Sequence, residues 1–516
     1  GHLRLYSPNK MALLPVSWLV LLPGVFCVIP EHEIKQLPGW REPFQFRMWS
    51  GYIPVKVDTS DTNIHVHYWL VECTKGLNNA PIVAWYQGGP GGSSLLALFT
   101  ENGPLTLNDD SFKSPQFKET GIPEVFSNPN SWHLEANMLY VEHPAPTGFS
   151  YCEPTKCPRW NDTLQAIANY RFLIKFFEAY PELSTSDFYL SGESYAGVLV
   201  PTVALQILDR EGDYLTSDFD ESSFNEDYDP WSNPWNLKGF AVGNACPGNR
   251  VFTCSPYSGW VGAQVGVDFR YGHGMISDET YIRVNEACKN DWGRFDAPRN
   301  KTCRKLLGDD PARPVIQEAG DTFTMGGGYY LYDHCGSDLY RLSKSGLPEP
   351  NVTSAPPEPE TLSEPKHGVY PCGQERATNF YLNQKVVQEA INVKPGEFSF
   401  ITPLHYNFTK HSLLDDYKQK LNKRYRILQY SGDADPCVPH VGTKRWIDSL
   451  EMPVKEPWRP WKIGKSPQVA GYTTVFETSA SSFTFATVRN AGHMVPRYKP
   501  VAALQMFKNF LNDYPL

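Results

Sequence analysis

The chain has 516 residues, 41% of them hydrophobic and 14% aromatic, which is enough apolar material to bury one large core or two ordinary ones. Its formal net charge of -9 provides no basic face for a phosphate backbone, so the composition excludes a nucleic-acid partner. The sequence is typical of a globular protein.

The first predicted element is a targeting segment. Residues 11–29 form an apolar run that follows a lysine and precedes the charged residues 31–33, which is the layout of a secretory signal. We therefore assign residues 1–30 to a signal peptide and the residues upstream of it, and we expect no membrane span after the signal is removed. An uncleaved signal anchor is the alternative, but Pro15 and Pro23 interrupt the run.

Cysteines and glycosylation motifs support this secretory route. One of the eleven cysteines, Cys27, lies in the predicted signal, and the other ten form an even set suited to an oxidising compartment. Cys152/Cys157 and Cys288/Cys303 are close enough in sequence to form local disulfides, whereas the alternative is a set of buried thiols. None of the spacings resembles a tetrahedral metal site, so we expect no metal. Four sequons predict glycosylation at Asn161, Asn300, Asn351 and Asn407.

Short apolar or alternating runs predict the strands of an α/β fold. They are Ile53–Val71, Ile82–Trp85, Asn137–Glu142, Phe188–Leu190, Ile427–Tyr430 and Phe483–Val488. Apolar residues at helical spacing predict a helix over Asp162–Ala179. Because strands that alternate with helices form parallel sheets, we expect a mostly parallel central sheet with helices on both faces.

The alternation of strands and helices fails over residues 246–371, which are rich in Gly, Pro, Cys and aromatic residues. We interpret this segment as an inserted cap region that divides the core into a first part, 31–245, and a second part, 372–516. Within the cap, residues 347–365 combine many prolines with Glu, Ser and Thr, so they are predicted to form an exposed loop that is open to proteolytic nicking.

The strongest chemical signal is a G-x-S-x-G motif in the segment Ser191–Gly197, between the strand that ends at Leu190 and an apolar helix that begins near Val198. In a nucleophile elbow the flanking glycines permit a sharp turn that lifts the serine hydroxyl above the sheet, and the helix N-terminus favours developing negative charge. Ser194 is therefore the predicted nucleophile. A tight glycine turn without chemistry is the alternative.

A catalytic serine needs a base and an orienting acid, which in this fold class follow it on loops after later strands. Asp435 follows the strand Ile427–Tyr430, and His493 follows the strand that ends near Val488. A single Asp or His on a loop is usually solvated, but three sites that agree in order and context predict a triad. Asp433 is the alternative acid if Asp435 is not the partner of His493.

A glycine-rich loop over residues 85–94 follows an early strand. Such loops expose backbone N–H groups, and a hydrolase needs a pair of them to stabilise a tetrahedral oxyanion. Phosphate binding is the alternative, but the run has neither the lysine of a nucleotide-binding loop nor a G-x-G-x-x-G pattern.

Seven segments, spread over nearly the whole mature chain, share one family pattern. They are the loop 85–94, Glu101–Pro104, Gly148–Tyr151, the elbow Gly192–Gly197, Phe240–Asn244, the Asp435 loop and Gly492–Pro496. On these segments the chain resembles the serine carboxypeptidases, α/β-hydrolases that release C-terminal amino acids from peptides and proteins through an acyl-enzyme. The resemblance implies a hydrolase that uses no cofactor.

The resemblance also implies roles for further residues. It assigns the oxyanion hole to the backbone N–H groups of Gly89 and Tyr195, and the S1′ pocket to Met494. It assigns recognition of the substrate's terminal carboxylate to Trp85, Gln87, Gly88, Glu101 and Glu193. Because two acids beside a carboxylate cannot all ionise, we expect raised pKa values for Glu101 and Glu193 and peptidase activity that is strongest at acidic pH. From the motif alone, Glu193 could equally be an incidental turn residue.

Two positions depart from the family pattern. Most members have Asn where Gln87 stands, and Gln is one methylene longer, so its amide can sit differently against a carboxylate. Most members also have Cys where Gly92 stands, usually bridged to a cysteine that resembles Cys372, which here must be unbridged or paired elsewhere.

Two other functions fit the same features. One is a serine carboxypeptidase-like acyltransferase, in which an alcohol intercepts the acyl-enzyme; acyltransferase relatives tend to change the residue at the position of Glu193, so its retention favours a peptidase. The other is a non-enzymatic protective or chaperone-like glycoprotein. For the peptidase we expect peptide or protein C-termini as partners and a lysosomal, vacuolar or extracellular location, and a homodimer is compatible with these features.

Overall fold

The computed structural model describes residues 29–57, 62–212, 235–251, 259–308, 328–332, 376–479 and 481–516. The predicted signal up to residue 28, the predicted loop 347–365 and the sequon at Asn351 lie outside these ranges. No helix within them is long and apolar enough to cross a membrane.

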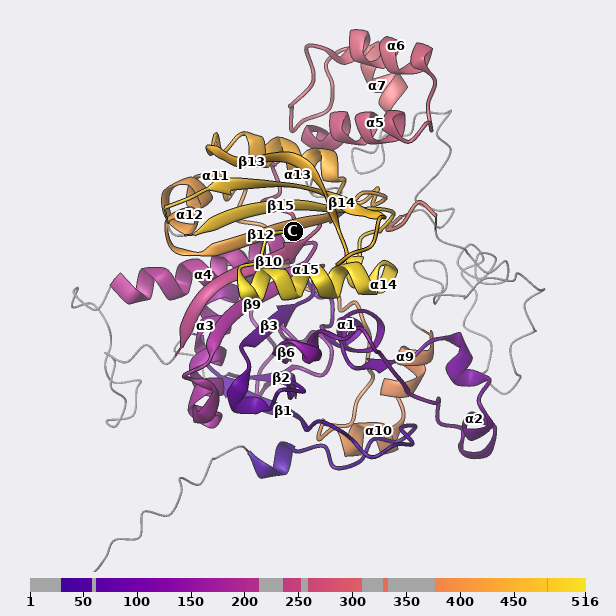
Figure 1. Ribbon diagram of the computed structural model, residues 1–516, viewed down its shortest axis with the longest axis vertical. Coiled ribbons are helices and arrows are strands. Elements are labelled where there is room, and N and C mark those ends of the chain that lie inside the picture. Colours follow the sequence, from indigo (N-terminus) through magenta and orange to yellow (C-terminus); the bar gives the residue numbers. More distant parts are fainter. Residues whose placement is uncertain are drawn as a thin grey trace, which may run out of the picture.

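One 11-stranded sheet forms the centre of the molecule (Figure 1). Its main path runs through β1 (Met48–Val55), β2 (Asn63–Val71), β6 (Asn137–Val141), β3 (Ile82–Tyr86), β9 (Asp187–Glu193), β10 (Asn236–Gly243), β12 (Arg426–Gly432), β15 (Ser482–Val488), β14 (Val469–Glu477) and β13 (Val454–Lys462), with β7 (Tyr151–Glu153) beside β2. Neighbouring strands from β6 to β15 are parallel, and the strand pairs at both edges are antiparallel. The prediction of a mostly parallel sheet is confirmed.

Helices cover both faces of this sheet, as predicted (Figure 1). One face carries α3 (Asp162–Ala179), α4 (Ala196–Gly212) and α13 (His440–Asp448). The opposite face carries α1 (Leu95–Thr100), α9 (Arg376–Leu382), α10 (Lys385–Ala390), α14 (Val495–Tyr498) and α15 (Pro500–Asn512). The central strands are therefore buried on both sides, which explains why they read as continuous apolar runs in the sequence.

The bounds of α3 match the predicted helix. The helix begins where Asn161 Oδ1 accepts hydrogen bonds from the backbone N–H groups of Thr163 (3.0 Å) and Leu164 (2.9 Å), which satisfies donors that have no partner inside the helix. Shorter elements lie in the connections: α2 (Pro115–Thr120), α11 (Leu414–Asp416), α12 (Asn422–Arg424), and the strand pairs β4 (Leu105–Thr106) with β5 (Phe126–Ser127) and β8 (Trp160–Asn161) with β11 (Tyr406–Asn407).

The antiparallel pair β13–β14 at one edge of the sheet is absent from the sequence prediction. Pro457 and Pro460 lie within β13, and proline in a run argues against a strand unless the strand lies at an edge. β13 is the edge strand, and nearly all of its side chains are at least partly exposed. It therefore shows neither the apolar run nor the alternation by which strands are recognised.

Helices α5 (Ala263–Gly272), α6 (Asp278–Cys288) and α7 (Lys301–Leu307) form a small cluster beyond one end of the sheet (Figure 1). They enclose a hydrophobic core of their own, and the predicted disulfide between Cys288 and Cys303 joins α6 to α7. An ion pair between Asp268 and Arg445 connects α5 to α13. These helices lie within the predicted cap region, whose boundaries remain a prediction.

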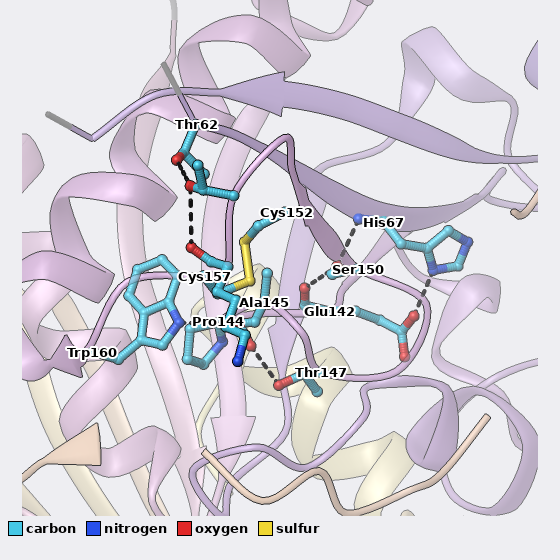
Figure 2. The surroundings of a disulfide bond; sticks show 12 residues. Thr62, His67, Glu142, Pro144, Ala145, Thr147, Ser150, Cys152, Cys157 and Trp160 are labelled. Carbon is cyan, nitrogen blue, oxygen red and sulfur yellow. Dashed lines mark hydrogen bonds and ion pairs between the residues drawn. A yellow bond between two sulfur atoms is a disulfide. The ribbon is translucent and has the colours of Figure 1, made fainter. Parts of the chain in front are cut away.

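Figure 2 shows the other predicted disulfide, Cys152–Cys157, and the turn beside it that follows β6. The fully buried carboxylate of Glu142 lies 2.7 Å from the Nδ1 atom of His67 on β2. Ser150 Oγ donates to the backbone oxygen of Glu142 (2.6 Å) and accepts from the backbone N–H of His67 (2.8 Å). These contacts fix the turn at the carboxyl end of β6 to the neighbouring strand.

The remaining described cysteines do not behave alike. Cys246 is also disulfide-bonded. Cys73, in contrast, is buried and forms no disulfide, which matches the alternative of a buried thiol rather than a fully bridged set.

Candidate active site

The predicted nucleophile lies at the sharp turn from β9 into α4. Ser194 has a φ of 63°, a left-handed conformation that is uncommon for a residue with a Cβ. Ser194 N donates to Gly243 O (2.9 Å), and Ser194 O accepts from Cys246 N (3.0 Å), so the turn is held from both sides. Ser194 is partly exposed whereas the residues before and after it are buried. The strained turn thus leaves the Ser194 side chain partly accessible to solvent while its neighbours in the chain are buried.

Asp435 and His493 come together from loops at the carboxyl ends of β12 and β15. His493 Nδ1 and Asp435 Oδ2 are 2.7 Å apart, and both side chains are buried. His493 Nε2 has no hydrogen-bond partner within the described residues. An imidazole whose Nδ1 donates to a carboxylate can accept a proton at Nε2, so the pair has the arrangement of a base with its orienting acid.

The Asp435 carboxylate accepts several further hydrogen bonds. Cys437 N donates to Oδ1 at 2.8 Å, while Val438 N (3.1 Å) and Asn244 Nδ2 (2.7 Å) donate to Oδ2. A buried carboxylate is tolerated only when its oxygens are hydrogen-bonded. These donors satisfy that requirement and fix the direction in which Asp435 faces His493.

Asp433, the alternative acid, has different contacts. Its Oδ1 accepts a hydrogen bond from Asn490 N at 2.6 Å, which attaches the loop that carries His493 to the end of β12. Burial raises the pKa of Asp433. In the described geometry His493 pairs with Asp435, whereas Asp433 binds the backbone of the loop that carries His493.

Asn244, just after β10, is a site residue to which the sequence assigns no role. Its backbone N–H donates to Tyr430 O (2.7 Å), its Oδ1 accepts from Gly432 N (3.1 Å), and its Nδ2 donates to Asp435. Its φ of 42° is left-handed, a conformation that Asn tolerates better than most residues. The sequence signals at this position are an asparagine directly after an apolar strand and its place at the end of the family segment Phe240–Asn244, neither of which assigns a role.

The glycine-rich loop packs directly against the elbow. A Cβ atom added to Gly88 would lie 2.6 Å from Ser194 Cβ and 2.8 Å from Tyr195 N, so only glycine permits this approach. The loop residue Gly89 follows with a φ of 116°. The two predicted oxyanion donors, Gly89 N and Tyr195 N, therefore come from segments that touch beside Ser194.

The residues predicted to recognise a carboxylate form one buried group. Trp85 Nε1 donates to Gln87 Oε1 at 2.9 Å. Gln87 Nε2 donates to Glu193 Oε1 at 2.6 Å and lies 3.5 Å from Glu101 Oε1. All four side chains are buried. Both polar atoms of the longer Gln87 side chain thus have partners. The Trp85 indole donates to its oxygen, and its amide nitrogen donates toward Glu193 and Glu101.

Burial, and next the nearby charge of Glu101, raise the pKa of Glu193 well above its ordinary value of 4.5. The physical reason is that two carboxylates without solvent cannot both ionise at low energetic cost. A protonated carboxyl group can donate a hydrogen bond to an incoming carboxylate, which an ionised one cannot. The group formed by Gln87, Glu101 and Glu193 is therefore suited to an anion when it retains a proton.

The second departure from the family pattern lies beside this group. Gly92 N donates to Gly88 O at 2.9 Å. A Cβ atom at position 92 would lie 2.7 Å from Gly88 O and 3.2 Å from Gln87 Cγ. The loop backbone and the long Gln87 side chain thus occupy the space that a side chain at position 92 would need.

The other predicted positions lie at separate places. Met494 is buried at the N-terminus of α14, in the same hydrophobic cluster as Trp85. Among the sequon residues, Asn300 caps α7 through its Oδ1, and Asn161 is the register partner of Asn407 between β8 and β11. Across the described ranges, no group of three or more His, Cys, Asp or Glu side chains could hold a metal ion.

Comparisons with known proteins agree on one family. A family model described as serine carboxypeptidase matches residues 38–513. Similar curated proteins include lysosomal protective protein of Mus musculus, 32% identical over 94% of this chain and 94% of that protein, and serine carboxypeptidase-like 20 of Arabidopsis thaliana, 29% identical over 97% and 99%. The fold is similar to that of the prohormone-processing carboxypeptidase Kex1 from Saccharomyces cerevisiae, with a TM-score of 0.63 and 20% identity over 95% of this chain and 97% of that one.

The raised pKa of Glu193 predicts how stability depends on pH. A carboxyl group that is harder to ionise in the folded state contributes its full stability below its unfolded pKa, near 4.5, and loses it as the pH rises toward the folded pKa. We expect Glu193→Gln to melt at about the wild-type temperature at low pH and above it at neutral pH, since wild type loses about 1.4 kcal/mol per pH unit in this window. Thermal unfolding of both proteins across this range measures the difference. An equal temperature gap at every pH would contradict the prediction.

Proposed function

The chain belongs to the serine carboxypeptidase family and is a serine-type carboxypeptidase; from this premise we propose that it releases C-terminal residues from peptides and proteins at acidic pH through an acyl-enzyme on Ser194. The observation that carries the proposal is the buried His493–Asp435 pair, whose Nε2 atom has no hydrogen-bond partner in the described part of the chain, together with the buried pair of acids Glu101 and Glu193.

In the proposed acylation step, His493 Nε2 takes the proton of Ser194 Oγ, which attacks the carbonyl carbon of the last peptide bond. The backbone N–H groups of Gly89 and Tyr195 stabilise the oxyanion. The C–N bond then breaks, and His493 returns the proton to the departing amino group. Deacylation repeats these events with water in place of the amine, which restores Ser194 and releases the shortened peptide. Asp435 stabilises the imidazolium in both halves.

Specificity for a chain end rests on the buried acid group in this proposal. Gln87 already directs its amide nitrogen toward the two glutamates, and a proton shared by Glu101 and Glu193 supplies the further donor that a substrate carboxylate needs. Gly88 and Trp85 complete the subsite, and Met494 contributes to the S1′ pocket. A peptide without a free C-terminus lacks the group that this site recognises.

The two alternatives have less support. An acyltransferase would need an alcohol in place of water, and the retention of Glu193 together with its 2.6 Å contact to Gln87 supports a peptidase site. A purely protective or chaperone-like role would need no aligned base and acid, whereas His493 and Asp435 are aligned.

A secretory route fits this function. The disulfides Cys152–Cys157 and Cys288–Cys303 support an oxidising compartment, and the sequon residues Asn300 and Asn407 are exposed. We propose that the chain enters the secretory pathway, is glycosylated, and resides in the lysosome, the vacuole or outside the cell. Formation of a homodimer stays a prediction.

The covalent step is tested with a fluorophosphonate probe. We expect the wild-type protein to be labelled and to hydrolyse an N-blocked dipeptide, and we expect Ser194→Ala to lose both properties, with activity reduced by several orders of magnitude. Circular dichroism of the variant checks that it is folded. Wild-type-like hydrolysis by folded Ser194→Ala would refute the proposed mechanism.

The choice of acid is tested by a matched pair of substitutions. Asp435→Asn should reduce kcat by about four orders of magnitude, because the amide no longer holds the His493 tautomer that the mechanism needs. Asp433→Asn serves as the control, and it should cost far less because Asp433 contacts the backbone of the loop rather than the imidazole. A larger loss in Asp433→Asn than in Asp435→Asn would show that the wrong carboxylate has been assigned.

The carboxylate subsite is tested by kcat/KM as a function of pH. For a peptide with a free C-terminus, wild-type activity should decline as the glutamate pair ionises, and Glu193→Gln, which keeps a donor but cannot titrate, should extend activity to higher pH. An amidated peptide and an ester substrate are the controls, since neither should respond in this way. An unchanged pH profile in Glu193→Gln would leave an unspecified serine hydrolase.

A further inference from the structure

Tyr430, near the end of β12, has a buried hydroxyl group that the mechanism above does not use. The residue is 1% exposed, and its hydroxyl has no hydrogen-bond partner among the described residues. A buried O–H group that makes no hydrogen bond is costly and rare in native proteins. Its position therefore calls for an acceptor that is nearby in at least one state of the site.

The register of the sheet shows where this hydroxyl lies. Gly243 on β10 is the partner of Glu193 on β9 and also of Tyr430 on β12. The three residues thus form one row across three parallel strands, with a glycine in the middle. A Cβ atom at position 243 would lie 2.5 Å from Tyr430 Cε2 and 2.8 Å from its hydroxyl oxygen. The tyrosine ring therefore lies over Gly243, which brings the hydroxyl toward the strand that carries Glu193.

One carboxyl oxygen of Glu193 is in the opposite situation, because it is an acceptor for which no donor is present among the described residues. No N–H or O–H group among the described residues donates to its Oε2 atom, which is buried. Within the described part of the chain, the row thus holds a buried hydroxyl with no acceptor and, across Gly243, a Glu193 carboxyl oxygen that has no donor once the Glu101–Glu193 pair has lost its shared proton. β9 and β12 are two strand spacings apart, about 10 Å, and the tyrosine ring that lies over Gly243 spans part of this distance.

The charges around the row are consistent with this pairing. Burial, and then the charges of Glu193 and Glu101, raise the pKa of Tyr430 well above its ordinary value, so the phenol stays protonated and is available as a donor when these acids ionise. Glu193 faces Glu101 from the end of α1, Gln87 from the glycine loop, and Asp435 from the loop after β12. Of these neighbours only Gln87 brings a permanent donor.

We propose that Tyr430 is a further positioning residue of the carboxylate subsite, whose hydroxyl donates a hydrogen bond to Glu193 when the Glu101–Glu193 pair gives up its proton. This inference rests on the proposed role of that pair in recognising a C-terminal carboxylate. A donor that binds only the ionised form lowers the pKa of the pair. Tyr430 therefore sets the upper limit of the pH range in which the subsite holds the proton that it needs.

The test measures binding rather than turnover, so it does not depend on the catalytic proposal. In the Ser194→Ala background, an N-blocked dipeptide acid is titrated by calorimetry across the acidic and neutral range. Tyr430→Phe should shift the pH at which affinity declines upward by about one unit, because the ionised pair loses a donor. The amidated dipeptide measures binding that is independent of the subsite. A midpoint that stays in place, or that moves to lower pH, would overturn the role of Tyr430.

Two controls separate this role from a structural one. Tyr417→Phe removes a hydroxyl from another fully buried tyrosine, which accepts a hydrogen bond from Gln429, and it should leave the midpoint in place. Tyr430→Phe in a Glu193→Gln background should add no shift, since the carboxylate that accepts from Tyr430 in this proposal can no longer form; an added shift would contradict the pairing. If free-acid and amidated dipeptides bind the Ser194→Ala protein equally at every pH, the carboxylate subsite itself is refuted.

A spectroscopic measurement covers the case in which Tyr430→Phe does not fold. In Ser194→Ala protein labelled with 13C at tyrosine Cζ, the Tyr430 resonance should move with the midpoint of dipeptide binding, and the Tyr417 resonance should not. A Tyr430 resonance that is constant through this midpoint would overturn the inference.

Discussion

The site depends on one buried negative charge. Asp435 has no access to solvent, and a carboxylate in that position destabilises the fold unless the protein provides donors for it. Those donors come from the turn that follows it and from Asn244, just after the neighbouring strand β10, whose Oδ1 in turn accepts from Gly432 N. The same carboxylate holds His493. The hydrogen bonds that compensate for the burial of Asp435 therefore connect the carboxyl ends of three parallel strands, β10, β12 and β15.

A second pair of acids in the same site is stabilised in the opposite way. Asp435 accepts hydrogen bonds from several donors, whereas Glu193 is buried beside the charge of Glu101, so retaining a proton is the easier solution there. One active site thus keeps a carboxylate that needs its hydrogen bonds and a carboxyl pair that needs its proton. In the proposed mechanism the carboxylate supports a base, and the protonated pair binds an anion. The number of hydrogen-bond donors around a buried acid, rather than its residue type, thus determines whether the acid is ionised or keeps its proton.

The sequence predicted what depends on local patterns. The apolar spacing over Asp162–Ala179 gave the bounds of α3, and strand-turn-helix order located the turn at Ser194. It could not predict Asn244 or Tyr430, because their contacts depend on which strands are neighbours in the sheet, and those strands lie far apart in the chain. The edge strand β13 was not predicted for another reason: its side chains are mostly exposed and include prolines, so its sequence lacks the apolar pattern of a strand.

The space beside Gly92 links two substitutions that look independent in the sequence. In this loop a Cβ atom at position 92 would lie 2.7 Å from Gly88 O and 3.2 Å from Gln87 Cγ, so a side chain there would require both the loop backbone and Gln87 to shift. Positions 87 and 92 are therefore sterically coupled on this backbone: glycine at position 92 leaves room beside the Gln87 side chain in the proposed carboxylate subsite.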